Sequence, residues 1–343
     1  MKRKNVLRLV TALVLVVALS ATFTACGGGD SSSAEGRQSV MLYGSLKDSQ
    51  LAAIREGFMA KHPNIVMDYY TAGTGNVMTK LATEQQAGGI AADLIWVGDP
   101  THYEQFKQQG LLLQYDSPVA ANVPDEFKDP DRYYISGRLI MLGFVYNTNM
   151  LTYDEAPKTW DDLLNPKLND YIAMTDPTTS GTTMFTVAGL VQHPNYGWDY
   201  FQALKDNNMR LERGSTGVVN SVAAGEYMVS VGVDYIAREI QAQGAPISFI
   251  YPADNIPLIE SPIAIIRNTS NPEAAKLLYD YIISEEGQQV LVDEYTMPIN
   301  PNMVLGDGWL SPEDAGRRML PVDAELLVAE RDNIVSRFDN IFK

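Results

Sequence analysis

Residues 176–185 read Asp-Pro-Thr-Thr-Ser-Gly-Thr-Thr-Met-Phe. An apolar run at 171–174 precedes this stretch and predicts a strand, and the apolar residues that follow have the spacing of one buried helix face. The first amides of a helix lack intrahelical acceptors, and the helix N-terminus carries partial positive charge. With Gly181 for close backbone approach and hydroxyls at Ser180, Thr182 and Thr183, this turn is suited to an anion. The alternative is that Ser180 or Thr179 only caps the helix.

Three earlier turns repeat this pattern. Apolar strands are predicted at 40–43, 65–67 and 92–97, and each is followed by a turn and then an amphipathic helix. The turns carry Ser45, Thr74 with Gly75, and Asp99. Strand–helix alternation with strands apolar on both faces predicts an α/β fold with mostly parallel, covered sheets. In such sheets ligands bind where the carboxyl ends of the strands gather, although each of these residues also suits a cap.

The first 38 residues are predicted to be an export signal and a tether. A basic start and an apolar run within 1–25 have the shape of a secretory signal, too short to span a membrane. Cys26 is the single cysteine, and the Gly/Ser-rich stretch after it suits a flexible linker. This arrangement resembles the lipobox of bacterial lipoproteins. The resemblance implies cleavage before Cys26, acylation of its thiol and attachment to the cell membrane.

Composition limits the function classes. Removal of 1–25 takes away four basic residues and moves the formal net charge from −16 to −20. So acidic a chain is a poor candidate for binding nucleic acid. The remaining length suits two domains of ordinary size.

Five motifs carry a resemblance to a known family, the extracytoplasmic solute-binding proteins of ABC importers. In chain order they are Ala-Ala-Asp-Leu-Ile-Trp at 91–96, Gly-Phe-Val-Tyr-Asn at 143–147, Thr-Trp-Asp-Asp-Leu at 159–163, Asp-Pro-Thr-Thr-Ser-Gly-Thr at 176–182 and Met-Pro-Ile-Asn-Pro at 297–301. Together they resemble the branch that includes ferric-ion, thiamine, phosphosugar and aminoethylphosphonate binders.

The resemblance implies a two-lobe periplasmic-binding-protein fold that closes by a hinge on a ligand in the cleft. Each lobe is expected to be a mostly parallel sheet flanked by helices. Lobe 1 would comprise 39–143 and 264–305, lobe 2 144–263, and a C-terminal helical segment, 306–343, would pack on them. The crossing strands are expected near 144–146 and 261–264. The expected partners are a small-molecule or ion ligand and the permease and ATPase of an importer; a monomer without cofactor is expected.

Candidate ligand-binding residues come from the turns and from positions beside the predicted hinge. Arg138 precedes a crossing strand, and a guanidinium can hold a phosphate or carboxylate through two hydrogen bonds. Asp234 suits an ammonium group and Tyr235 a donor or stacking ring, while Glu260 lies next to the hinge. The full set is Ser45, Thr74, Gly75, Asp99, Arg138, Ser180, Gly181, Thr182, Thr183, Asp234, Tyr235 and Glu260.

The ligand class stays open between several solutes. An organophosphorus zwitterion such as 2-aminoethylphosphonate, or a phosphate ester, suits donors together with Asp234. A ferric ion is the alternative, because hard anionic oxygens hold it and Asp234 with Tyr235 offers two. Thiamine is a further possibility within the family.

Two functions of other classes compete with a binding protein. A secreted hydrolase is disfavoured, because the sequence has no Gly-x-Ser-x-Gly elbow and no His-Glu-x-x-His motif. An adhesin-type lipoprotein would have no cleft that closes on a ligand. The chain is therefore predicted not to be an enzyme.

Overall fold

The computed structural model describes residues 38–343. The predicted signal segment, Cys26 and nearly all of the predicted tether lie outside the described residues. In the described part, nine strands form one continuous sheet in the order β2-β1-β3-β9-β4-β7-β5-β6, with β8 paired to β4.

The first group of elements, called lobe 1 below, is built on parallel strands. β1 (Gln38–Gly44) pairs in parallel with β2 (Ile65–Thr71) and β3 (Leu94–Trp96), and β9 (Leu258–Ile265) pairs antiparallel with β3. Its helices are α2 (Asp48–Lys61), α3 (Thr74–Gln86), α4 (Thr101–Gln108), α9 (Pro272–Ile283) and α10 (Glu285–Asp293). Their apolar faces and the sheet share buried side chains such as Leu42, Phe58 and Leu278.

The second group, called lobe 2, repeats this design. β5 (Ile172–Thr175) pairs in parallel with β6 (Arg210–Glu212) and β7 (Val229–Val233), while β8 (Ile247–Ile250) pairs antiparallel with β4. Its helices are α5 (Gly181–Gln192), α6 (Gly197–Asp206), α7 (Ser215–Ala223) and α8 (Asp234–Ala242). Four short 3₁₀ helices lie in loops of the described chain. Before β4 come η1 (Pro118–Asn122) and η2 (Asp125–Phe127), and after it come η3 (Asp161–Leu164) and η4 (Pro166–Leu168).

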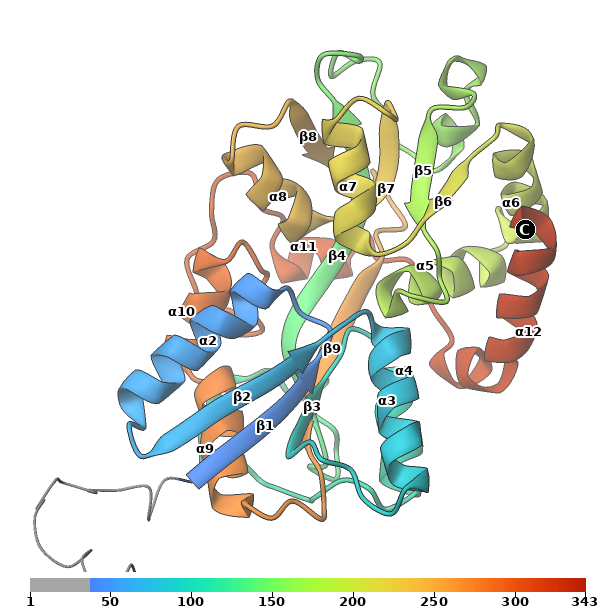
Figure 1. Ribbon diagram of the computed structural model, residues 1–343. Helices are drawn as coiled ribbons and strands as arrows, with labels where there is room; N and C mark the ends of the chain where they lie inside the picture. The colour runs from blue at the N-terminus through green and yellow to red at the C-terminus, as the bar shows by residue number, and fades with distance from the viewer. Residues whose placement is uncertain (1–37) are drawn as a thin grey trace, which may run out of the picture. The chain divides into compact units, whose positions relative to one another are not determined.

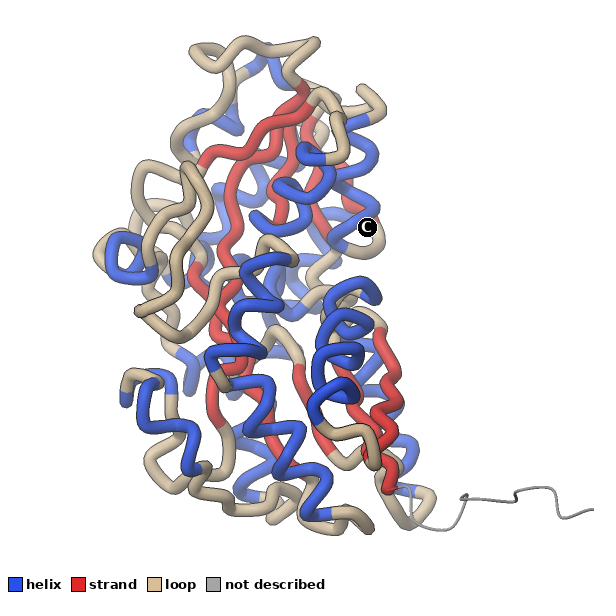
Figure 2. Tube along the Cα trace, turned by 90° about the vertical axis from the view of Figure 1, so that its left-hand side faces the viewer, coloured by secondary structure: helices blue, strands red, loops and turns tan. Residues whose placement is uncertain are grey.

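One long strand joins the two lobes. β4 (Ile135–Asn147) pairs with β9 over 135–141 and with β7 over 142–146, so it changes partner between Met141 and Leu142. All of its residues are buried, which accounts for the apolar run at 139–146. Figure 1 shows β4 and β9 passing together between the two groups of strands. In Figure 2, helices flank the long strands along their length. The crossings predicted near 144–146 and 261–264 lie on these two strands and stay a prediction.

The last helix packs on lobe 2. α11 (Pro312–Gly316) is short, and α12 (Ala324–Phe342) buries Leu327, Ile334, Phe338 and Phe342 in the core that also holds β5 and β7. The structure thus places α12 on the lobe 2 core, whereas Ala315 of α11 belongs to the lobe 1 core. The extents of the lobes that we predicted, 39–143 with 264–305 and 144–263, remain proposals.

Local predictions were accurate where the apolar spacing was clear. The strands at 40–43, 65–67 and 92–97 and their helices are confirmed as β1 to β3 and α2 to α4. The motif at 159–163 contains a capping box, in which Thr159 N donates to Asp162 Oδ2 at 2.8 Å and Asp162 N donates to Thr159 Oγ1 at 3.3 Å. Among the described residues, no helix is both long and apolar enough to cross a membrane.

Candidate anion-binding site

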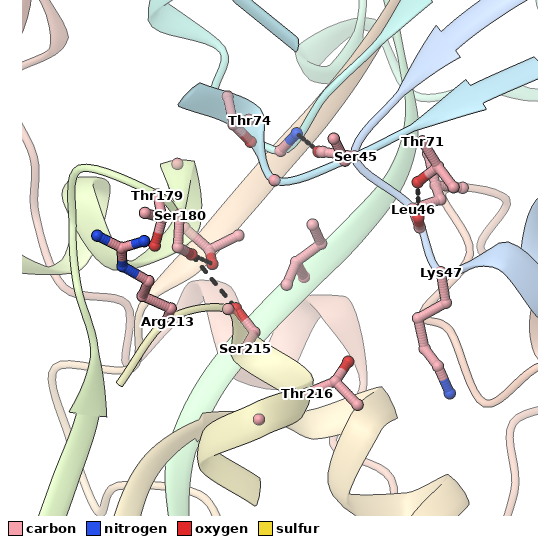
Figure 3. A pocket seen from close by; sticks show the side chains of 18 residues that line it. Ser45, Leu46, Lys47, Thr71, Thr74, Thr179, Ser180, Arg213, Ser215 and Thr216 are labelled. Carbon is pink, nitrogen blue, oxygen red and sulfur yellow. Dashed lines mark hydrogen bonds between the residues drawn. The ribbon is translucent and has the colours of Figure 1, made fainter. Parts of the chain in front are cut away.

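A cavity of about 380 Å³ lies where turns of both lobes meet. Lobe 1 contributes the turns after β1, β2 and β3, and lobe 2 contributes those before α5 and α7. Ile140 of β4 also lines the cavity (Figure 3). The lining residues are Ser45, Leu46, Lys47, Thr71, Ala72, Gly73, Thr74, Gly98, Ile140, Thr179, Ser180, Gly181, Thr182, Arg213, Gly214, Ser215, Thr216 and Gly217.

Four helices begin at this cavity. Lys47 is the N-cap of α2, Gly73 that of α3, Ser180 that of α5 and Gly214 that of α7, and all four residues line the cavity. The first amides of each helix have no intrahelical acceptor, and each N-terminus carries about half a positive charge. Their convergence makes the cavity favourable for a negatively charged group.

Hydroxyl groups cluster around Ser180. Ser180 Oγ accepts the Thr183 amide at 3.3 Å, which caps α5, and lies 3.0 Å from Thr182 Oγ1. It also lies 3.4 Å from Ser215 Oγ on α7, as Figure 3 shows. Ser180 is therefore both the predicted helix cap and a lining residue, so the two interpretations of this turn do not compete.

The turns of the two lobes touch each other beside the cavity. A Cβ atom at Gly73 would lie 2.5 Å from Thr179 O, and one at Gly75 would lie 2.4 Å from Thr178 O. A Cβ at Gly181 would lie 2.7 Å from Asp99 Cβ. All three distances are shorter than van der Waals contact, so the observed approach of the lobes requires glycine at these positions.

The charged side chains of the lining are both cationic. Lys47 Nζ forms an ion pair with Glu239 of α8, which links lobe 1 to lobe 2, and burial lowers the pKa of Lys47. Arg213 is exposed at the edge of the cavity and has no ion pair or hydrogen bond within residues 38–343. The lining contains no aspartate or glutamate. Arg213 is thus a cation available to a ligand.

The structure brings five of the predicted site residues into the lining: Ser45, Thr74, Ser180, Gly181 and Thr182. Ser45 Oγ accepts the Gly98 amide at 2.9 Å, which holds the turns after β1 and β3 together. Gly75 and Thr183 lie directly next to lining residues. Gly75 contacts the opposite lobe, and Thr183 is buried behind Ser180 with its hydroxyl 3.1 Å from Ser180 Oγ.

Arg138 and Tyr235 lie next to each other outside the cavity lining. Arg138 is completely buried, donates to Gln50 Oε1 at 2.9 Å, and has its guanidinium 5.1 Å from the Tyr235 ring centroid and 5.8 Å from that of Trp96. Its Nη2 atom has no hydrogen-bond partner within the described residues. Arg138 thereby connects α2 of lobe 1 with α8 of lobe 2.

Asp234 and Asp99 are buried and Glu260 is half-buried, and all three lie outside the cavity lining. Asp234 Oδ1 accepts the Met141 amide at 3.4 Å, and burial raises the pKa of Asp234 to about 6. Glu260 accepts a hydrogen bond from Ser136, and burial raises its pKa. Asp99 accepts hydrogen bonds from Thr101 N at 3.1 Å and Thr101 Oγ1 at 2.6 Å. A ligand role for these residues remains a prediction.

Sequence reasoning missed the cations and the third hydroxyl-rich turn of the lining. Ser215, Thr216 and Gly217 combine hydroxyls with a glycine, as 180–182 do, but are absent from the predicted site. Lys47 lies two residues after Ser45 in a turn that was predicted to bind ligand, but Lys47 itself was not among the predicted residues. Arg213 had no signal of its own, because its position depends on β6, a three-residue strand.

Metal-ligand chemistry is sparse in the described part. Within residues 38–343, no three His, Cys, Asp or Glu side chains come together as a metal-binding group. The residues proposed for a ferric ion, Asp234 and Tyr235, both lie outside the cavity lining.

Comparison with known proteins places the chain in a family. Residues 90–325 match the family model of the bacterial extracellular solute-binding proteins. The chain belongs to this family. Proteins of this family bind a solute outside the cytoplasm and are in general not enzymes. The substrate-binding protein of an ABC transporter from Agrobacterium tumefaciens shares the fold, with 17% identity and a TM-score of 0.81 over 91% of this chain and 96% of that protein.

Individual relatives agree with this assignment. The chain is 24% identical over 222 residues to the phosphoglycerate transport regulatory protein PgtC of Salmonella typhimurium, covering 61% of this solute-binding protein and 54% of PgtC. It is 25% identical to the periplasmic binding protein P5PA, with a TM-score of 0.78 over 89% of this chain and all of P5PA. AfuA of Actinobacillus pleuropneumoniae, solved with exogenous fructose 6-phosphate, has 22% identity and a TM-score of 0.79 over 89% of this chain and 99% of AfuA. The predicted two-lobe fold class is confirmed.

Proposed function

We propose that this solute-binding protein captures a small organophosphorus anion, a phosphate ester or phosphonate, and delivers it to the permease of an ABC importer. The convergence of four helix N-termini on one cavity that is lined by cations and hydroxyls carries the proposal. A phosphoryl group has three acceptor oxygens and up to two negative charges, which suits many donors arranged around a point.

The geometry favours an anion over the zwitterion that the sequence suggested. An ammonium group would need an acceptor with negative charge near the phosphoryl site. Asp234 was the candidate, but its carboxylate faces the Met141 amide and lies outside the lining. In place of an acidic residue, the lining offers hydroxyls and Arg213, which suit a polar group or a second anionic group on the solute. A sugar phosphate combines a phosphoryl group with hydroxyls, and a phosphorylated carboxylate combines it with a second anion.

Names of similar proteins support the choice of probes. PgtC is named for phosphoglycerate transport, and AfuA was crystallised with fructose 6-phosphate. A thermal-shift screen of the full chain should therefore include both solutes, 2-aminoethylphosphonate, thiamine and ferric citrate. A ligand that binds only the folded state stabilises it by about 2.7 kcal/mol at ~100 times its Kd. Stabilisation by ferric citrate or thiamine alone would contradict the proposal.

Arg213 supplies the sharper test of the site. Arg213→Gln should weaken binding of the best organophosphorus solute by about 1.5–3 kcal/mol, the contribution of a charged hydrogen bond. Arg210→Gln is the matched control, because Arg210 is also an exposed arginine of this segment but pairs with Asp170 at 3.3 Å. Isothermal titration of both variants decides; equal affinities would remove Arg213 from the site.

We further infer that the protein is held at the extracytoplasmic face of the membrane through an acylated Cys26. The support is the single cysteine at the end of a signal-like segment, before a Gly/Ser-rich stretch. Cys26→Ser should release the protein into the soluble extracytoplasmic fraction. Retention of the variant in salt-washed membranes would refute the anchor.

A further inference from the structure

The C-terminal helix is an integral part of lobe 2. Phe338 of α12 is completely buried and its ring centroid lies 5.6 Å from that of Phe201 on α6. Lys205 Nζ donates to Phe342 O at 3.0 Å, and Asp323 N, at the N-cap of α12, donates to Gln192 Oε1 of α5 at 2.8 Å. α12 is therefore expected to move with α5 and α6 when the lobes separate.

The middle of the same helix reaches lobe 1. Arg331 Nη1 lies 2.8 Å from Asp99 Oδ2 and 3.3 Å from Thr101 Oγ1, at the turn between β3 and α4. In Figure 1, α12 runs from α6 toward the region of α4. Arg331 thus connects an element of lobe 2 to a turn of lobe 1.

The turn that Arg331 holds borders the candidate binding site. Gly98 lines the cavity, and the neighbouring Asp99 Cβ lies against Gly181 at the start of α5. Asp99 is completely buried between the lobes. Separation of the lobes at Gly181 would expose this carboxylate to water and draw it away from α12.

The carboxylate of Asp99 depends on Arg331 in the closed arrangement. Its Oδ1 accepts two hydrogen bonds from Thr101. Its Oδ2 forms the ion pair with Arg331 but accepts no hydrogen bond of good geometry within the described residues. The other cationic candidate near Oδ2 is His102 Nε2 at 3.5 Å, and burial lowers the pKa of His102. Without Arg331, closure would bury a poorly compensated negative charge, which is strongly unfavourable.

We propose that Arg331 is a closure-determining residue, whose ion pair with Asp99 favours the closed form and so raises solute affinity without contact with the solute. In the open form Asp99 is hydrated and needs no partner, so the pair stabilises closure selectively. Because apparent affinity scales with the fraction of protein that can close, loss of the pair weakens binding of any solute. The inference rests on solute capture between the lobes and is independent of the phosphoryl chemistry proposed above.

The test measures the distance between lobes in the ligand-free full chain. Spin labels at Gln86→Cys on α3 and Gln202→Cys on α6, both exposed, report lobe separation in a Cys26→Ser background. We expect Arg331→Gln to lower the ratio of closed to open populations about tenfold, and Arg331→Lys to lower it less. Arg337→Gln is the matched control, because Arg337 lies on the same helix but stacks on Trp198 of lobe 2. Its distances should equal those of the wild type.

The double variant Asp99→Asn/Arg331→Gln separates a closure role from general destabilisation. With the buried charge removed, the closed population should recover in part relative to Arg331→Gln, a coupling that unrelated damage to α12 would not produce. If fructose 6-phosphate binds the wild type, its affinity should be highest for the wild type, intermediate for the double variant and lowest for Arg331→Gln. Identical distance distributions in Arg331→Gln and the wild type overturn the proposal, whether or not an organophosphorus solute is found.

Discussion

At the scale of single residues, three glycines determine how closely the two lobes approach. Gly73 and Gly75 lie against the carbonyl oxygens of Thr179 and Thr178, and Gly181 lies against Asp99. From the sequence, Gly181 was expected to allow a ligand close to the backbone. In the structure the absence of a side chain at Gly181 instead allows the turn after β3 of lobe 1 to pack closely against the start of α5 in lobe 2.

Gly75→Ala should separate stability from affinity. Gly75 lies in the first turn of α3, where alanine is favoured over glycine by up to about 1 kcal/mol. The added methyl group would meet Thr178 O at 2.4 Å when the lobes close. Unfolding by urea should thus show equal or higher stability, while titration shows at least about tenfold weaker solute binding.

Gly316→Ala on α11 is the control for that substitution. Gly316 lies outside the cavity lining and its Cβ would have no heavy atom within 4 Å, so alanine should act on the helix alone. Unchanged affinity in Gly75→Ala would show that the lobes bind solute without the approach described here.

Asp234 should make stability depend on pH. Burial raises its folded pKa to about 6 from the ordinary value of 3.8, so the folded state holds this proton more tightly than the unfolded chain. Its contribution to stability is therefore present below pH ~4 and is lost as the pH rises through ~6. The loss amounts to about 2–3 kcal/mol at 1.36 kcal/mol per pKa unit.

Asp234→Asn retains the oxygen that accepts the Met141 amide but cannot ionise. Relative to the wild type it should be about 2–3 kcal/mol more stable at pH 8 and equally stable at pH 4. Denaturant unfolding at both pH values measures this difference. A variant that is less stable than the wild type at pH 8 would contradict the assignment, and loss of solute affinity would return Asp234 to the binding site.

Predictions for single residues were correct where a side chain and its hydrogen-bond partner belong to the same turn. Ser180 caps the helix that starts at the next residue, and a cap is readable from adjacent residues. Arg138 shows the limit. Its acceptor, Gln50 Oε1, is 88 residues away in sequence, and its depth depends on β4 beginning at Ile135, three residues before it. Nothing local to Arg138 indicates complete burial.

At the scale of elements, periodicity identified the long helices and apolar strands but missed short or exposed ones. β6 has three residues, none of them buried, and therefore has no hydrophobic pattern. α8 begins at Asp234, so Asp234 and Tyr235, which the sequence offered only as candidate ligand residues, form its first turn. The position of α7 and Arg213 beside the cavity follows from β6, so this part of the site could not be predicted.

Phe338→Ala should weaken the whole of lobe 2. The Phe338 ring is completely buried, with its centroid 5.6 Å from that of Phe201 and 4.6 Å from that of Phe342. Truncation to alanine removes buried apolar surface and leaves a cavity, at a cost of about 3–5 kcal/mol.

Leu326→Ala on the same helix is the control for Phe338→Ala. Leu326 is 45% exposed, so the change should stay within about 0.5–1 kcal/mol. Equilibrium unfolding of both variants measures the difference. Similar small losses would mean that α12 is not part of the lobe 2 core.

At the scale of the whole molecule, two buried strands carry the chain between lobes while ion pairs and glycine turns meet across the cleft. Lys47 pairs with Glu239, Arg331 with Asp99, and the binding cavity lies among the turns that these pairs join. The two-lobe architecture was predictable because five motifs in order resemble one family. The electrostatic character of the cavity was predicted only in part, because one of its four helix N-termini, that of α7, was not assigned to it, nor were its two cations, Lys47 and Arg213.

The central claim is that this cavity recognises a phosphoryl group. Isothermal titration with solute pairs that differ only in that group tests it most directly: fructose 6-phosphate with fructose, and 3-phosphoglycerate with glycerate. The account predicts that at least one phosphorylated member binds with a dissociation constant of about 10 μM or lower, and at least about 100-fold more tightly than its partner, as expected for several charged hydrogen bonds. If neither phosphorylated member binds better than its unphosphorylated partner, the account is wrong.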